Sequence, residues 1–185
     1  MSSLALFRAL GFFAAENFFS ADDCARIRDV MRESPSETAQ IYTAAGVETD
    51  DRIRRTRSVK VPPANREEIT SRLGDARDRV AAHFGVTLSK MEGPVFLTYR
   101  SGDFFLRHTD RNDDDARGRQ VSFIAFLNSD FDGGTLKFYG GVKDKPLELA
   151  LRAQDGLLIG FRSDWLHEVE PVSSGERHTV VGWFV

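Results

Sequence analysis

The second half of the chain alternates apolar and polar residues over short stretches, a pattern typical of β-strands. Successive side chains of a strand point to opposite faces, so a period of two marks a strand with one buried face. Glycines and short polar segments separate these stretches, as expected for turns. The pattern predicts strands over residues 94–100, 104–108, 120–128, 135–139, 147–151, 157–161, 167–172 and 177–185. An earlier stretch, 53–61, predicts one further strand that extends the same sheet.

The first part of the chain shows helical spacing instead. Ser20 precedes an apolar periodic segment and is followed by Asp23, a pattern typical of a capping box at the start of a helix over 21–33. A similar signature begins at Asn65, after which apolar residues recur every three or four positions until Gly85. This second segment predicts a helix over 66–84.

Helices followed by many short strands predict an α+β, mainly β protein. The order fits a double-stranded β-helix, the jelly-roll or cupin-like core, with the N-terminal helices packed on one face. We expect the 185 residues to form a single domain, because domains commonly contain about 100 to 200 residues. Residues 1–92 would supply helical support with one early strand, and residues 93–185 would form the β core.

Composition narrows the class of partner. The net charge is −3 and no basic stripe is present, so we do not expect nucleic acid as a partner. Cys24 is the only cysteine and cannot form an internal disulfide, which favours a buried structural thiol in a reducing compartment. The first 14 residues are apolar but lack a basic segment and a span of about 20 apolar residues, so we expect a cytoplasmic protein without a membrane anchor. We expect a monomer or a weak homodimer.

Two histidines and one carboxylate are the candidate chemistry. His108 and Asp110 are two residues apart at the end of a predicted strand, so both can coordinate one ion while Thr109 faces away. His167 begins a distant predicted strand and can supply the third ligand. Two imidazole nitrogens and one carboxylate oxygen on one face of an octahedron suit Fe(II) and leave positions for a co-substrate and O₂. Taken alone, the His108 and Asp110 pair is better interpreted as an ordinary surface or core contact, and the neighbouring sequence favours the metal site instead.

Other metals fit the sequence less well. Zinc remains open, but the zinc proteases carry their histidines four apart on a helix, and no such helix is predicted here. A calcium-binding EF-hand loop starting at Asp110 would need Gly at position 115 and Glu at position 121. Asp115 and Val121 stand there, so the acidic run 113–115 is interpreted as a solvated loop.

Arg177 points to the co-substrate. A buried guanidinium can hold the distal carboxylate of 2-oxoglutarate through two parallel hydrogen bonds, although an exposed arginine at a strand start is the plain alternative. His178 is adjacent on the same strand and should therefore face the opposite side. His83, late in the predicted helix, is interpreted as a surface residue. Large aromatic residues are candidates for an apolar enclosure, namely Phe104, Phe123, Phe126, Phe138 and Trp183.

These residues resemble the Fe(II)- and 2-oxoglutarate-dependent dioxygenases, within them the prolyl 4-hydroxylase-like group that includes the hypoxia-sensing prolyl hydroxylases. The match runs from Tyr99 onward. It rests on Tyr99-x-x-Gly102-x-x-Phe105-x-x-His108-x-Asp110, Phe126-Leu127-Asn128, Gly133-Gly134-x-Leu136, Asp155-Gly156-Leu157-Leu158, His167-Glu168-Val169, and Arg177 with Trp183.

The resemblance implies roles for these positions. His108, Asp110 and His167 would bind iron and form the catalytic centre. Arg177 would pair with the distal carboxylate of 2-oxoglutarate, with Tyr99 and Leu136 as further co-substrate contacts. O₂ would be the oxidant and ascorbate a possible reductant. The intact carboxylate of Asp110 favours hydroxylation, since related halogenases replace this ligand with a small residue.

Two features depart from the pattern or extend it. Many relatives have Tyr where Phe105 stands, so a hydroxyl is missing from this pocket. The upstream segment Arg54-Arg55-Thr56-Arg57-Ser58 resembles an Arg-Thr-Ser-containing strand near the peptide groove of prolyl hydroxylases. The same arginines could instead form the solvated edge of a sheet, where positive charge discourages edge pairing.

The hypothesis drawn from this resemblance is hydroxylation of a C–H bond, with release of succinate and CO₂. The expected substrate is a prolyl residue in a protein or peptide. A second hypothesis is a free amino acid or other small metabolite, expected if the region 37–52 closes as a lid over a compact cavity. A third, of a different class, is a non-catalytic β-barrel that binds a ligand or partner.

Overall fold

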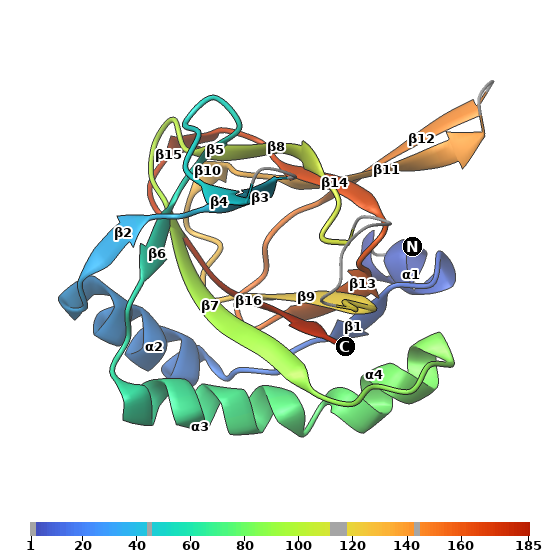
Figure 1. Ribbon diagram of the computed structural model, residues 1–185, viewed down its shortest axis with the longest axis horizontal. Coiled ribbons are helices and arrows are strands. Elements are labelled where there is room, and N and C mark those ends of the chain that lie inside the picture. Colours follow the sequence, from blue (N-terminus) through green and yellow to red (C-terminus); the bar gives the residue numbers. More distant parts are fainter. Residues whose placement is uncertain (1–2, 44–45, 112–117, 143–144) are drawn as a thin grey trace.

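The computed structural model describes residues 3–43, 46–111, 118–142 and 145–185. Two antiparallel sheets face each other, and three helices cover the outer side of the larger one (Figure 1). The double-stranded β-helix expected from the sequence is therefore confirmed, with helices on one face. No helix in the described ranges is both long and apolar enough to span a membrane.

The larger sheet has seven strands within the described residues, all paired antiparallel. In spatial order they are β1 (Phe13–Ala15), β13 (Leu158–Arg162), β9 (Val121–Phe126), β16 (Arg177–Phe184), β7 (Met91–Tyr99), β6 (Arg57–Val59) and β2 (Ser36–Thr38). Alternate residues of the central strands face the interior between the sheets, and the others face the helices. Val180 on the helix side and Arg177 on the interior side are both buried.

The smaller sheet has five strands in the described ranges: β12 (Lys145–Leu151), β11 (Leu136–Val142), β14 (Leu166–Val169), β8 (Phe104–His108) and β5 (Arg54–Arg55). The hairpin of β11 and β12 extends away from the body of the protein (Figure 1). Two short pairs complete the β structure: β10 (Asp132–Gly133) with β15 (Val172–Ser174), and β3 (Ile41–Thr43) with β4 (Gly46–Glu48).

The helices are α1 (Ser3–Ala9), α2 (Ala21–Glu33), α3 (Pro63–Gly74) and α4 (Arg77–Phe84). The expected helix over 21–33 and its capping box are confirmed, because the Ser20 hydroxyl accepts from the Asp23 amide and the Asp23 carboxylate accepts from the Ser20 amide. The helices α2, α3 and α4 bury apolar residues against the outer face of the larger sheet. The buried helix residues include Cys24, Ile27, Met31, Ile69, Leu73 and Val80.

The single helix expected over 66–84 is wrong. The structure has two helices, which are separated after Gly74, and the first begins at Pro63 rather than after Asn65. Proline fits the first helical turn because its fixed φ is already helical and its missing N–H is not needed there. The end at Gly85 is confirmed, since this residue takes the left-handed conformation that glycine adopts without strain.

The expectation of one early strand is also wrong. Before residue 91 the described chain contains β1 to β6, and the stretch 53–61 divides at Thr56. Its first half, β5, pairs with β8 in the smaller sheet, and its second half, β6, pairs with β7 in the larger sheet. The buried Thr56 hydroxyl donates to the Thr98 carbonyl at 2.9 Å, so it satisfies a backbone group where the chain crosses between sheets. Strands of two or three residues carry too little periodicity to be predicted.

Candidate metal and co-substrate site

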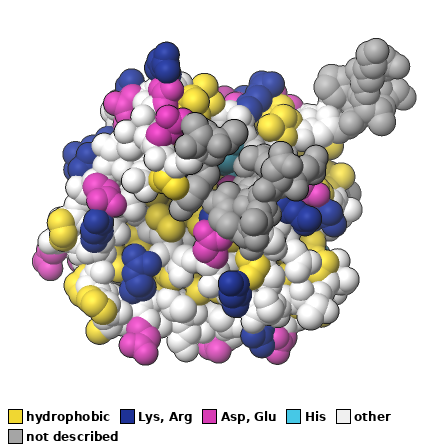
Figure 2. Space-filling model, viewed as in Figure 1, with side chains coloured by type: hydrophobic (Ala, Val, Ile, Leu, Met, Phe, Trp, Pro, Cys, Tyr) yellow, Lys and Arg dark blue, Asp and Glu magenta, His cyan; other side chains and the backbone are white. Residues whose placement is uncertain are grey.

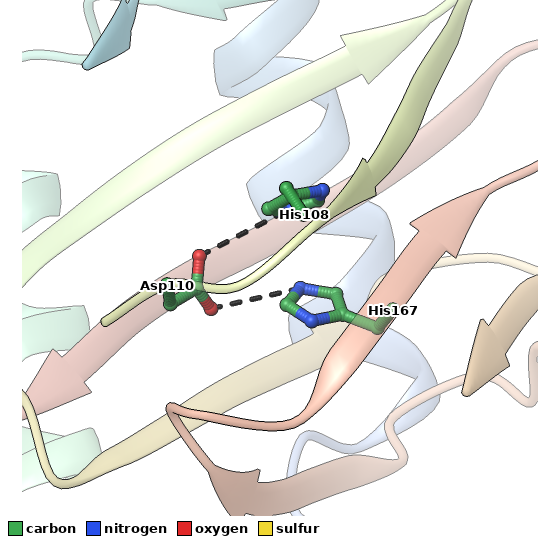
Figure 3. A group of neighbouring side chains, drawn as sticks. All are labelled: His108, Asp110 and His167. Carbon is green, nitrogen blue, oxygen red and sulfur yellow. Dashed lines mark ion pairs between the residues drawn. The ribbon is translucent and has the colours of Figure 1, made fainter. Parts of the chain in front are cut away.

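Three side chains converge where β8 of the smaller sheet ends beside β14. His108 and His167 are directly opposite each other on β8 and β14, and Asp110 follows β8 by two residues. Their ligand atoms lie within 4.8 Å of one another (Figure 3). The Asp110 carboxylate is 3.8 Å from Nε2 of His108 and 3.6 Å from Nε2 of His167. The Ser163 carbonyl, which accepts from the Asp110 amide at 2.9 Å, fixes the backbone of the carboxylate ligand.

Backbone carbonyls set the orientation of both imidazoles. Nδ1 of His108 lies 2.7 Å from the Leu106 carbonyl, and Nδ1 of His167 lies 2.8 Å from the Trp165 carbonyl. A carbonyl can only accept, so each Nδ1 carries the proton and each Nε2 keeps a free lone pair. Both lone pairs are therefore available toward Asp110. This is the tautomer that a metal-ligating histidine needs.

The charge states suit a cation as well. Burial lowers the pKa of His108 to about 3, helped by the neighbouring His167, so this imidazole is neutral at neutral pH. Burial opposes ionisation of Asp110, but the two histidines and the nearby Ser122 and Trp183 outweigh it and lower the pKa of the carboxyl. The site therefore offers one negative oxygen donor together with the imidazole nitrogens of two histidines.

A cavity of about 380 Å³ opens onto these three residues. Figure 2 looks onto the same side of the molecule as Figure 1, and a histidine side chain is visible in a hollow of this surface. Of the aromatic residues expected to enclose the site, Phe123 and Trp183 line the cavity. The other three, Phe104, Phe126 and Phe138, are not part of its wall. Phe126 and Phe138 are instead packed in the interior core beside it.

Arg177 is the most unusual group near the cavity. Its side chain is buried, with 1% exposure, and its guanidinium Nη1 makes a 3.4 Å hydrogen bond to the Thr179 hydroxyl. Nε and Nη2 have no hydrogen-bond partner among the described residues. Burial lowers the pKa of Arg177 to about 10, which still leaves it charged at neutral pH. A buried cation with unpartnered donors is costly, so this group fits an anion supplied from outside the chain.

The expected co-substrate contacts differ in position. Tyr99 lines the cavity, and the Arg177 guanidinium carbon lies 5.0 Å from the centre of its ring, just behind the cavity wall. Leu136 is fully buried, opposite Val169 in the smaller sheet, and is not part of the cavity wall. The structure therefore brings Tyr99 and Arg177 together. Leu136 instead packs in the core, because it is an apolar residue on the inward face of its strand.

The remaining histidines behave as their positions predicted. His178 faces the helix side of β16, away from the cavity, and its Nδ1 lies 3.1 Å from the Thr98 hydroxyl. His83 is exposed and its Nε2 contacts the Gly11 carbonyl at 3.0 Å. The acidic run 113–115 lies outside the described residues.

The arginine segment divides between the two roles considered for it. Arg54 lines the cavity, where its guanidinium carbon lies 4.6 Å above the centre of the Phe105 ring. Phe105 in turn stacks on the His108 imidazole at 3.5 Å with an angle of 17°. Phe105 thus contacts a candidate metal ligand through its ring face. Arg55 is exposed on β5, the edge strand, and Arg57 binds the Ser36 carbonyl of β2 at 2.6 Å.

Sequence reasoning missed one ion pair in the cavity wall, between the buried Arg119 and the half-buried Glu92. Arg119 lies 3.5 Å above the Trp183 ring and forms an ion pair with Glu92. Its Nη1 also donates to the Asp110 carbonyl at 3.4 Å. No spacing rule links positions 92 and 119, because they meet only when β7 and the start of β9 are placed on either side of β16.

Comparison with known proteins agrees with this geometry. The family model described as 2OG-Fe(II) oxygenase superfamily matches residues 94–185. A PKHD-type hydroxylase of Picosynechococcus is 35% identical over 91 residues, which is 48% of this chain and 40% of that protein. The chain thus spans well under two thirds of the length of the first curated relatives that it matches.

Solved structures match over nearly the whole chain. A prolyl-4-hydroxylase of Pseudomonas putida has a TM-score of 0.74 at 25% identity, covering 98% of this chain and 97% of that one. A prolyl hydroxylase of Trichoplax adhaerens, in complex with a hypoxia inducible factor peptide fragment, has a TM-score of 0.74 at 20% identity. It covers 98% of this chain and 86% of that one, and shows the shared fold.

Proposed function

Since the chain belongs to the 2OG-Fe(II) oxygenase superfamily, we propose that it is an Fe(II)- and 2-oxoglutarate-dependent hydroxylase of prolyl residues in a protein or peptide. The observation that carries the proposal is that two features occur at the same cavity. Three ligand atoms converge with both imidazoles in the ligating tautomer, and a buried arginine with free donors lies behind the same cavity.

His108, Asp110 and His167 would hold the metal. Two nitrogens and one carboxylate oxygen are the donor set that suits Fe(II) with open positions, so the residues present fit this ion. Bound Fe(II), with 2-oxoglutarate and O₂, supplies the oxidising chemistry that inserts a hydroxyl group and releases succinate and CO₂. The protein contributes a fixed ligand geometry and a neutral His108 imidazole that does not repel the cation.

Arg177 and Tyr99 would hold the co-substrate. The free Nε and Nη2 of Arg177 can donate two parallel hydrogen bonds to the distal carboxylate of 2-oxoglutarate. This pairing would neutralise a buried cation that has no ion partner in the described residues. Because the pairing strengthens in a dry interior, the apolar residues around it, Phe126 among them, support binding rather than merely fill space.

A prolyl substrate is supported by the nature of the relatives. Both solved structures described above are prolyl hydroxylases, and one holds a peptide fragment. The cavity wall includes Arg54 and Ser58 of the segment that resembles a peptide-groove strand. These polar groups can hydrogen-bond the carbonyls of an extended peptide.

A free amino acid or other small metabolite is the second candidate. Residues 37–41, part of the region expected to act as a lid, line the cavity together with Ile53. The volume of about 380 Å³ lies near the lower end of the range for small-molecule sites. A compact chamber covered by this segment would admit a metabolite more readily than a long peptide.

Mass spectrometry separates the candidates. The protein would be incubated with Fe(II), 2-oxoglutarate and O₂, and either a library of proline-containing peptides or free amino acids, with Asp110→Ala as the inactive control. The proposal predicts succinate formation and the gain of one oxygen atom on proline within a peptide. A gain of oxygen on free amino acids alone would support the second candidate. Absence of succinate with every substrate tested would favour a non-catalytic binding protein.

A further inference from the structure

Asn128 lies where β9 ends beside the first residue of β16. In the antiparallel register of these strands, Thr179 is opposite Phe126, so two more residues would place Asn128 opposite Arg177. The backbone ladder continues only as far as the Leu127 amide, which donates to the His178 carbonyl at 3.0 Å. Asn128 is only 3% exposed. Beyond Leu127 its side chain, and not its backbone, forms the hydrogen bonds to β16 and the residue before it.

The side chain contacts the peptide groups on both sides of Arg177. Oδ1 of Asn128 accepts from the His178 amide at 2.8 Å, and Nδ2 donates to the Glu176 carbonyl at 2.7 Å. Nδ2 also donates to the Asp130 carboxylate at 2.6 Å. One side chain therefore fixes the backbone immediately before and after the arginine.

This backbone clamp matters because the guanidinium is weakly held. Arg177 is joined to Tyr99 by strand pairing on one side, and on the other side Asn128 replaces the missing strand. The guanidinium itself makes one long hydrogen bond, to Thr179, and otherwise packs on aromatic rings. Its position thus depends on where its backbone is placed. A displacement of the backbone would move the two free donors away from a carboxylate, whose bidentate pairing requires close alignment.

We propose that Asn128 is a positioning residue for the co-substrate: it sets the backbone of Arg177 so that the guanidinium meets the distal carboxylate of 2-oxoglutarate. The inference rests on the proposed function. Asn128 touches neither the three ligand residues nor the cavity wall, so its effect is confined to the carboxylate contact and acts through Arg177.

The test is a binding measurement on Mn(II)-loaded protein by titration calorimetry, without O₂ and without turnover. Asn128→Ala should weaken 2-oxoglutarate binding roughly three- to tenfold, the loss expected for about one net hydrogen bond. Binding of 2-oxopentanoate, which has the same chain length but no distal carboxylate, should not change. Mn(II) affinity should also stay the same. Asp130→Ala, which removes the third contact of Asn128 but leaves both peptide contacts, is the matched control and should bind 2-oxoglutarate as the wild type does.

A double-mutant cycle shows whether Asn128 acts through Arg177. In an Arg177→Met background, Asn128→Ala should cause little further loss, because the group that it positions is gone. Asn128→Asp, of the same size but without the donor to Glu176, provides a second variant if the alanine protein fails to fold, and should also weaken 2-oxoglutarate binding.

The outcomes separate the two claims. Equal 2-oxoglutarate affinity in wild type and the Asn128 variants overturns the inference and leaves the proposed function intact. Equal losses for 2-oxoglutarate and 2-oxopentanoate also overturn it, since they indicate general loosening of the site. A wild-type protein that binds no 2-oxoglutarate overturns the proposed function and the inference with it.

Discussion

Replacing Arg177 with methionine should separate two effects of the buried charge: the stability that it costs the unliganded protein and the affinity that it gives for 2-oxoglutarate. Methionine is unbranched and flexible, so it fills much of the space left by the arginine stem without carrying charge. The variant removes the one cation whose Nε and Nη2 lack partners among the described residues. We therefore expect it to weaken 2-oxoglutarate binding without harming the fold.

The magnitude follows from the pKa of the buried group. Burial lowers the pKa of Arg177 to about 10, well below the ordinary value of an arginine, so the unfolded chain holds this proton more tightly than the folded chain. Stability therefore rises as pH increases from about 10 toward the ordinary arginine pKa, and the whole penalty is present at pH 7. At about 1.4 kcal/mol for each pKa unit, the penalty is of the order of 3 kcal/mol. Since some packing is lost, the free energy of unfolding of unliganded Arg177→Met should be unchanged or raised by up to about 3 kcal/mol.

Ligand binding should change in the opposite direction. A charge-assisted hydrogen-bonded pair contributes about 1.5 to 3 kcal/mol, so the dissociation constant for 2-oxoglutarate should rise roughly 10- to 150-fold. Urea unfolding of the unliganded protein and calorimetric titration with Mn(II) present measure the two effects. Arg162→Met, at an exposed arginine paired with Asp164, is the matched control and should change neither. Wild-type affinity in Arg177→Met would refute the co-substrate role, and a loss of several kcal/mol of stability would refute the claim that the cation is unpaired.

Three further changes test other parts of the structure. Asp110→Ala should abolish Mn(II) binding measured by calorimetry, because it removes the only anionic donor of the three-residue site; retained binding would reject the site. Gly156→Ala should lower the free energy of unfolding in urea by about 2 to 4 kcal/mol, since a Cβ would lie 2.0 Å from the Phe19 carbonyl oxygen at φ +73°, whereas Gly140→Ala, which meets nothing within 4 Å, should change it little. Asp23→Ala should cost about 1 kcal/mol at pH 7 through loss of the helix cap. Hydrogen bonding with Ser20 holds the pKa of Asp23 below its ordinary 3.8, so the stabilisation is present above that pH and the difference from wild type should shrink as pH falls below it; a difference constant down to pH 2 would contradict this.

Much of the site could be predicted from the sequence because its chemistry is local. His108 and Asp110 are two residues apart at a strand end, and their spacing alone places both on one side of the chain. His167 could be proposed as the third ligand from its residue type and its place at a predicted strand start, and the resemblance in motifs supported it, although its partner strand is distant in sequence. Its position directly opposite His108 is a property of strand register, which the pattern of apolar residues does not specify at strand ends.

The parts that could not be predicted depend on side chains that meet across several strands. Asn128 stands in a run of buried residues and looks like the end of a strand, but its role comes from hydrogen bonds to residues that follow 48 and 50 positions later. The division of 53–61 between two sheets likewise depends on which neighbour each half finds, rather than on its own periodicity. Local pattern therefore indicates the longer strands and helices, whereas tertiary pairing decides how they are joined and where the short strands form.

Crystallography of the protein soaked with Mn(II) and 2-oxoglutarate in the absence of O₂ tests the central claim most directly. The account predicts an anomalous peak bonded to Nε2 of His108, Nε2 of His167 and the Asp110 carboxylate, with the distal carboxylate of 2-oxoglutarate on Nε and Nη2 of Arg177. A metal bound elsewhere, or a 2-oxoglutarate molecule whose distal carboxylate does not contact Arg177, would contradict it.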